Sequence, residues 1–179
     1  RWAKGPKIGS RLINARAETL ATSNAFRSAF RKRRCIVPVT GFYEWRKTPG
    51  VKVKQPFFVH HPDGVPYAFA GLWEVWRGPD GDQEPLRSCT IVTTTPNEPM
   101  RAIHDRMPVI LPPERWDRWL DRDEEDTDLL GQLLVPASPE VIAMRPVSTQ
   151  VNNVRNDGPE LTDEAAPADL PDLPAALDL

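Results

Sequence analysis

The stretch CIVPVTGFYEW, residues 35–45, decides the fold. It is largely apolar, but Pro38 and Gly41 interrupt it, so an extended conformation is predicted. Two further strand-like runs follow, QPFFVHH (55–61) and PYAFAGLWEVW (66–76). The sequence PDGV (62–65) between them is a strong turn signal, and it predicts that these two runs form a β-hairpin.

The remaining periodic segments add strands and two helical regions. SCTIVTTT (88–95), MPVIL (107–111) and EVIAMRPVS (140–148) are predicted strands. A helix is predicted within residues 22–34, with Thr22 or Ser23 as N-cap, and a second one over residues 112–134. About five strands with two helices outside the strand series predict a β-rich α+β fold and argue against a Rossmann-type enzyme.

The length and composition bound the class of protein. A chain of 179 residues suits one domain. It has no run near the ~18 apolar residues of a membrane span and no recognisable signal peptide, so a cytoplasmic protein is expected. Cys35 and Cys89 lie in apolar segments and are interpreted as reduced core residues. No Cys/His spacing resembles a zinc site, and no metal or other cofactor is expected.

The charges are distributed unevenly along the chain. Residues 1–54 contain 14 Lys or Arg and only two acids, Glu18 and Glu44, although the whole chain has a formal net charge of −2. Such a positive field suits a polyanion, most often nucleic acid, whereas the run RKRR (31–34) alone would suit a solvated face. From about Pro159 the chain is acidic, rich in Pro, Ala and Leu, and predicted to be disordered.

Polar residues interrupt three apolar segments. Asn14 and Arg16 follow Leu12 and Ile13, Glu44 lies between two aromatic residues, and His104 and Arg106 precede a predicted strand. Burial between aromatic rings can raise the pKa of a carboxyl group and suit it to acid/base work. Each residue alone is more often structural. Together, an amide, a carboxylate, an imidazole and two guanidiniums indicate a candidate site.

Several motifs, in order, resemble one family. INARAET (13–19), RRCIVPVTGFYEWRK (33–47), FAGLWE (69–74), CTIVTTTPN (89–97), IHDRMPVIL (103–111) and VRNDGPEL (154–161) resemble those of the SRAP family, whose name stands for SOS-response-associated peptidase. The resemblance spans residues 1–161 and leaves 162–179 as the tail. It implies antiparallel strands in a barrel-like fold with peripheral helices, and a bacterial, nucleoid-associated protein whose partner is single-stranded DNA containing abasic sites, with no protein partner or membrane.

The resemblance also implies a chemistry for these residues. In the family, a cysteine exposed by removal of the initiator Met captures the abasic aldehyde as a Schiff base and then a thiazolidine, so peptidase-type and lyase-like activities are both implied. Asn14 would hold the linked sugar, Glu44 would transfer protons, and His104 would assist ring opening. The DNA-binding residues would be Trp2, Arg16, Trp45 and Arg106.

The sequence departs from the family at its start. The family's N-terminal segment with its Met-Cys is not present, so we interpret the chain as an N-terminally truncated SRAP domain and expect it to be inactive in thiazolidine formation. Two alternatives remain open. One is a cysteine hydrolase that uses Cys35 or Cys89 with His104. The other is a non-catalytic module that binds single-stranded DNA.

Overall fold

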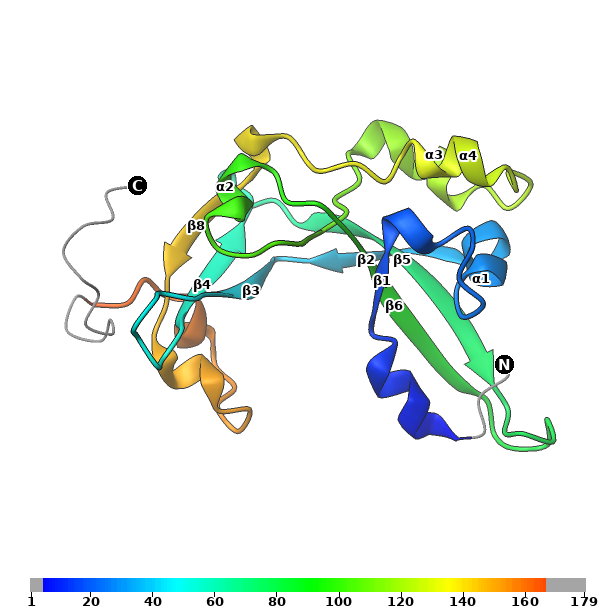
Figure 1. Ribbon diagram of the computed structural model, residues 1–179, viewed down its shortest axis with the longest axis horizontal. Coiled ribbons are helices and arrows are strands. Elements are labelled where there is room, and N and C mark those ends of the chain that lie inside the picture. The colour runs from blue at the N-terminus through cyan, green and yellow to red at the C-terminus, as the bar shows by residue number, and fades with distance from the viewer. Residues whose placement is uncertain (1–4, 167–179) are drawn as a thin grey trace.

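The structure, a computed structural model, describes residues 5–166; Trp2 and most of the acidic tail lie outside this range. Figure 1 shows two β-sheets side by side, with helical segments beside them. The larger sheet has the strand order β1-β6-β5-β2, with β7 paired to β6, and the smaller has the order β3-β4-β8. The strands are β1 (Asn14–Arg16), β2 (Arg34–Val39), β3 (Gly41–Arg46), β4 (Gln55–His60), β5 (Tyr67–Trp76), β6 (Leu86–Thr94), β7 (Met107–Pro108) and β8 (Ala143–Pro146).

The stretch 35–45 links the two sheets. β2 is an edge strand of the larger sheet, where Pro38 is tolerated because its missing N–H breaks no central ladder. The chain then enters β3 of the smaller sheet through Gly41. A Cβ on Gly41 would lie 2.6 Å from the carbonyl oxygen of Val59, so the close approach of β3 and β4 requires glycine here.

The hairpin prediction was wrong, although both of its strands exist. β4 pairs with β3 and β8, whereas β5 pairs with β2 and β6. The expected turn does form, with Gly64 at φ 70° and its N–H donating to the carbonyl of His61 at 3.0 Å. It carries the chain from β4 in one sheet to β5 in the other, so each strand pairs with segments more distant in the sequence.

The helical segments are shorter than predicted. α1 (Arg27–Lys32) has Phe26 as N-cap with no side-chain cap, and Ser23 accepts from Ala25 N–H in the preceding turn. The second predicted helix is broken into η3 (Pro113–Arg115), α3 (Trp116–Leu120) and α4 (Thr127–Gly131), because the acidic stretch 121–126 forms turns and Asp126 caps α4. The other helical segments are η1 (Pro6–Arg11), η2 (Ala17–Thr19), α2 (Glu98–Arg101), η4 (Pro139–Val141), η5 (Thr149–Asn152) and η6 (Pro159–Thr162).

The main core lies between one face of the larger sheet and the helical segments that follow β1 and β7. Leu20, Phe30, Leu72, Val92 and Trp119 are fully buried there. A smaller cluster of Val59, Met100 and Met107 lies where the two sheets meet, with Phe42 packed against it. On the opposite face of the larger sheet, Phe69 is buried against Phe42, whereas Asn14, Arg16 and Cys89 are exposed; this exposed part is called the open face.

The basic run RKRR is engaged within the fold. Arg34 is buried and donates hydrogen bonds to backbone carbonyls at the ends of α1 and α3, including Phe30 and Trp119. Arg31 and Lys32 form ion pairs with Glu125, and Arg33 pairs with Glu74. The positive field expected for residues 1–54 therefore rests on the other cations of that segment.

The predicted class, a β-rich α+β fold dominated by antiparallel strands, is confirmed, with the parallel pair β1–β6 as an exception. Within residues 5–166 the strands form two open sheets and close no barrel. The ordered chain continues past residue 161, because Glu164 forms a β-bridge with Val147. None of the helices within the described range has the length and apolar character needed to cross a bilayer.

Candidate functional site

The parallel pairing of β1 with β6 places Asn14 and Arg16. Asn14 lies opposite Ile91 and Arg16 opposite Thr93, so their exposed side chains share the sheet face that is turned away from the main core. Ala15, between them, points into the core and is 1% exposed. The alternation in NAR thus presents an amide and a guanidinium on one open face.

Glu44 comes from β3 of the other sheet. Phe42, two residues earlier on the same face of β3, packs edge-on against Phe69 of β5 with ring centroids 5.5 Å apart. This contact turns the Phe42–Glu44 face of β3 toward the open face of the larger sheet. The Glu44 side chain is 21% exposed, so its carboxylate is largely removed from water.

His104 lies against Glu44. It is in the turn between α2 and β7, and its Nε2 is 3.9 Å from Oε2 of Glu44. The backbone N–H of Arg106 donates to Nδ1 of His104 at 3.1 Å. This N–H favours a neutral ring protonated on Nε2, the nitrogen that faces Glu44, whereas the carbonyl oxygen of Arg106, 3.3 Å from Nδ1, favours a proton on Nδ1. Asp105 lies 3.3 Å from Nδ1 but is 88% exposed.

The electrostatics of Glu44 fit a proton-transfer group. Burial raises the pKa of this carboxyl group, and the neighbouring His104 opposes the rise. A carboxylate with a raised pKa beside an imidazole can exchange a proton near neutral pH more readily than a solvated glutamate. The structure therefore brings together the two residues that the sequence analysis named as acid/base candidates.

Arg106 is held by a residue that the sequence analysis did not single out. Its Nη1 and Nη2 donate to the two carboxylate oxygens of Glu18 at 2.7 and 3.0 Å. Nη2 also donates to the carbonyl oxygen of Thr93 at 2.6 Å. Glu18 belongs to the NARAE segment (14–18), and this position, four residues after Asn14, was the only sequence feature that could have suggested a place for Glu18 near the site. By contrast, the exposed Arg16 has no side-chain hydrogen bond within residues 5–166.

Trp45 lies on the other side of β3 from Glu44. Its Nε1 donates to Oδ1 of Asn152 at 2.6 Å, and its ring packs near that of Tyr43. The described residues thus place Trp45 apart from the His104–Glu44 pair, on the face covered by η5. Trp2, the other aromatic residue expected to contact DNA, lies outside the described residues.

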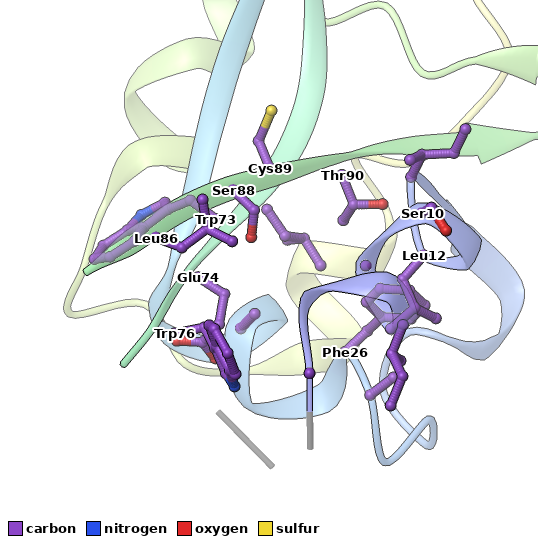
Figure 2. A pocket seen from close by; sticks show the side chains of 17 residues that line it. Ser10, Leu12, Phe26, Trp73, Glu74, Trp76, Leu86, Ser88, Cys89 and Thr90 are labelled. Carbon is purple, nitrogen blue, oxygen red and sulfur yellow. The ribbon is translucent and has the colours of Figure 1, made fainter. Parts of the chain in front are cut away.

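The two cysteines are not both core residues, which corrects the expectation from the sequence. Cys35 is half-buried, and burial raises the pKa of its thiol to about 11. Cys89 is exposed. Figure 2 shows the Cys89 sulfur on the opposite side of β6 from Ser88 and Thr90, which face an apolar pocket of about 360 Å³ between η1, α1 and the sheet. The alternation along β6 thus puts this thiol on the open sheet face.

The side chains on and beside the open face have the chemistry to exchange protons and to bind anions. Within residues 5–166 no three His, Cys, Asp or Glu side chains are grouped so as to hold a metal ion. The chemistry that these residues can perform themselves is proton transfer by Glu44 and His104 and anion binding by Arg16.

Comparisons with known proteins give the family. Residues 1–154 match the family model described as SOS response associated peptidase (SRAP). The chain is 46% identical to the abasic site processing protein YoqW of Bacillus subtilis over 160 residues, covering 89% of this chain and 70% of that protein. It is 36% identical to the abasic site processing protein YedK of Escherichia coli, covering 89% of this chain and 68% of that one.

A solved structure agrees with this assignment. The fold matches the crystal structure of a protein from Bacteroides thetaiotaomicron with a TM-score of 0.81 and 28% identity, covering 92% of this chain and 72% of that chain. The family match includes β1, β3 and the turn before β7, which carry Asn14, Glu44 and His104. Because the family model matches the residues that build the site and the fold agrees with it, the chain belongs to the SRAP family.

Proposed function

We propose that this chain binds abasic sites in single-stranded DNA and promotes reaction of an amine with the sugar aldehyde. The observation that carries the proposal is the His104–Glu44 pair, with Nε2 and Oε2 3.9 Å apart, at the junction of the two sheets. It lies in a chain whose relatives are named abasic site processing proteins.

The reaction needs a proton carrier at two steps. The opened sugar presents an aldehyde; an amine adds to it to give a carbinolamine, which loses water to give an imine. Glu44 removes the proton from the adding amine and returns it to the departing hydroxyl, so the carboxylate is regenerated. During ring opening, Glu44 takes the proton of the C1 hydroxyl and the Nε2–H of His104 donates a hydrogen bond to the sugar ring oxygen; the proton then passes from Glu44 to that oxygen, so both side chains are regenerated. Asn14 holds the sugar through its amide.

The stable form of capture needs one more group. When amine and thiol belong to one N-terminal cysteine, the thiol adds to the imine and closes a thiazolidine, with water as the only by-product. Cys35 and Cys89 are internal residues and have no free α-amine. The described residues thus supply the acid/base groups, and the aminothiol has to come from a cysteine at the N-terminus of the polypeptide.

The DNA backbone would be bound beside this pair. Arg16 is exposed, and although its charge acts on the nearby Glu18, it forms no ion pair with that residue. Its planar guanidinium can therefore bind a phosphate through two hydrogen bonds. Arg106 can reach a phosphate only by exchanging its bond to Glu18. Trp2 and Trp45 remain proposed aromatic contacts to unstacked bases.

Borohydride trapping with an abasic oligonucleotide tests the proposal. Wild-type chain should give a reduced adduct with abasic DNA and none with intact DNA. Glu44→Gln and His104→Ala should each slow trapping, on the order of 10²-fold as is usual for loss of a general acid or base, and Asn14→Ala should slow it as well. Glu125→Gln and His61→Ala remove the same groups elsewhere and should leave the rate unchanged.

Two results would replace the proposal with another function. Tight binding of single-stranded DNA with no difference between abasic and intact strands would indicate a non-catalytic binding module. Loss of trapping in Cys35→Ala would indicate cysteine-based catalysis, which the raised thiol pKa of about 11 argues against because a reactive cysteine needs a lowered pKa.

A further inference from the structure

The carboxylate of Glu18 ties together two of the chain segments that build the site. It follows β1, which carries Asn14 and Arg16, and it accepts two hydrogen bonds from Arg106, which belongs to the His104 turn. The two donor–acceptor distances, 2.7 and 3.0 Å, describe the parallel fork by which arginine holds a carboxylate. The Arg106 side chain is only 18% exposed, so this pair is shielded from solvent on the arginine side.

The tie continues from Arg106 to the ring of His104. The guanidinium of Arg106 is also anchored on the carbonyl oxygen of Thr93 in β6, at 2.6 Å. With its side chain fixed at both places, the backbone N–H of Arg106 is held where it donates to Nδ1 of His104. The N–H of Arg106 favours the ring protonated on Nε2, the nitrogen that faces Glu44. It competes with two acceptors that favour a proton on Nδ1, the carbonyl oxygen of Arg106 and Oδ1 of Asp105, each 3.3 Å from Nδ1.

We propose that Glu18 is a positioning residue, which holds Arg106 and thereby keeps His104 in the tautomer with its Nε2 proton facing Glu44. The assignment rests on the proposed function for its catalytic consequence, but its structural content can be measured separately. A role in DNA binding would not explain Glu18, because a carboxylate between Arg16 and Arg106 weakens attraction for phosphates. Its bond to Arg106 holds the pKa of Glu18 below the usual range, which keeps the anchor ionised.

The tautomer of His104 gives the first readout. Ring ¹⁵N shifts, measured on the full chain without DNA, report which nitrogen of the neutral imidazole is protonated. Wild type should show mainly the Nε2–H form. Glu18→Ala should raise the Nδ1–H fraction severalfold, and Glu18→Gln, which keeps one acceptor for Arg106, should give an intermediate value. Glu125→Ala removes a surface carboxylate that also pairs with two cations, and it should leave the tautomer unchanged.

The split between binding and reaction gives the second readout. Trapping of abasic DNA by borohydride should be roughly tenfold to hundredfold slower in Glu18→Ala, the loss expected when a catalytic group is misplaced by about 1 Å. Affinity for single-stranded DNA should stay equal or become tighter, because a negative charge has been removed. A purely structural role would instead lower affinity and rate together, and Glu18→Gln would not rescue the rate.

The results that would overturn the assignment are specific. An unchanged tautomer in both variants, with tighter DNA binding and an unchanged trapping rate, would make Glu18 a counter-charge and no more. If Glu18→Ala does not fold, the same comparison is made with Glu18→Gln. A wild-type chain that traps no abasic DNA would contradict the proposed function, but the shift of the tautomer in the variants would still support the positioning role.

Discussion

Nε2 of His104 lies 3.9 Å from Oε2 of Glu44, although the two residues are carried by elements that join different sheets. Glu44 is on β3 of the smaller sheet, and His104 precedes β7, which pairs with β6 of the larger one. The pair therefore forms only when the two sheets meet correctly. Its acid/base properties depend on packing at this junction.

Replacing Glu44 should stabilise the fold at neutral pH. Burial raises the pKa of Glu44, so the folded chain keeps a proton on it at a pH where the unfolded chain has released it. Stability is therefore lost as the pH rises from the ordinary glutamate range through the raised pKa. Glu44→Gln does not titrate, so it should match wild type below about pH 4 and exceed it at pH 7.

Thermal unfolding over this pH range checks the expectation. For a chain of this length, a change of 1 kcal/mol corresponds to roughly 2–4 °C in Tm. Glu125→Gln is the control; it should be destabilised slightly or not at all at pH 7, because it loses only two surface ion pairs, those with Arg31 and Lys32. A Glu44→Gln variant less stable than wild type at pH 7 would show that the carboxylate is held by compensating contacts.

Arg16→Ala should reduce the salt dependence of DNA binding. Each phosphate contact to a single strand contributes about 0.7 to the slope of log K against log[salt], so the slope should fall by about that amount. The affinity should drop up to about fivefold, because an exposed ion pair contributes at most about 1 kcal/mol. Arg118 is an exposed arginine on α3, and Arg118→Ala should change neither the slope nor the affinity. A slope unaffected by Arg16→Ala would remove Arg16 from the proposed interface.

The sequence predicted the strands well and their partners poorly. Strong β-propensity located β4, β5 and β6, but propensity is local, and the turn at 62–65 looks the same whether it closes a hairpin or passes between sheets. The length of the helix predicted over 112–134 was overestimated, because the helical spacing of apolar residues at Trp116 and Trp119 continues for one turn only. The acidic residues after it favour turns and caps.

For the site too, the sequence identified residues but not their contacts. Glu44 and His104 could be named because charged residues beside apolar runs are conspicuous in a sequence. Their proximity could not be derived, since it depends on two sheets joining. Glu18 is a charged residue at an ordinary helical start, and only the fold reveals that it meets Arg106, 88 residues later.

Arg34→Met should be strongly destabilising. The buried guanidinium donates to five backbone carbonyls, those of Phe30, Arg31, Trp119, Asp121 and Glu124. Methionine replaces the volume but leaves these acceptors without a donor, so we expect a loss of at least about 3 kcal/mol. Denaturant unfolding measures it, with Arg31→Met as the exposed control from the same run. A loss below about 1 kcal/mol would mean that water replaces the guanidinium.

The two thiols should react at very different rates. At pH 8 a thiol with a pKa of about 11 is ionised in about one molecule in a thousand, and Cys35 is also half-buried. Cys89 is exposed on β6 and should be alkylated first by iodoacetamide under native conditions. Peptide mass spectrometry over time distinguishes the sites, and denaturant should equalise them. Preferential native labelling of Cys35 would instead point to an activated nucleophile.

A polypeptide made of these 179 residues alone should form no heat-stable adduct with abasic single-stranded DNA. Its α-amine belongs to Arg1, which can add to the aldehyde and lose water to give an imine, but no thiol on the same residue can close the thiazolidine ring. The imine should hydrolyse on heating or, after β-elimination, leave a nicked strand. A denaturing gel with and without borohydride separates these outcomes, and Arg1→Cys tests whether an α-amine and thiol together restore stability. A shifted band that survives heating without reductant in the unmodified chain would show that another residue is the nucleophile.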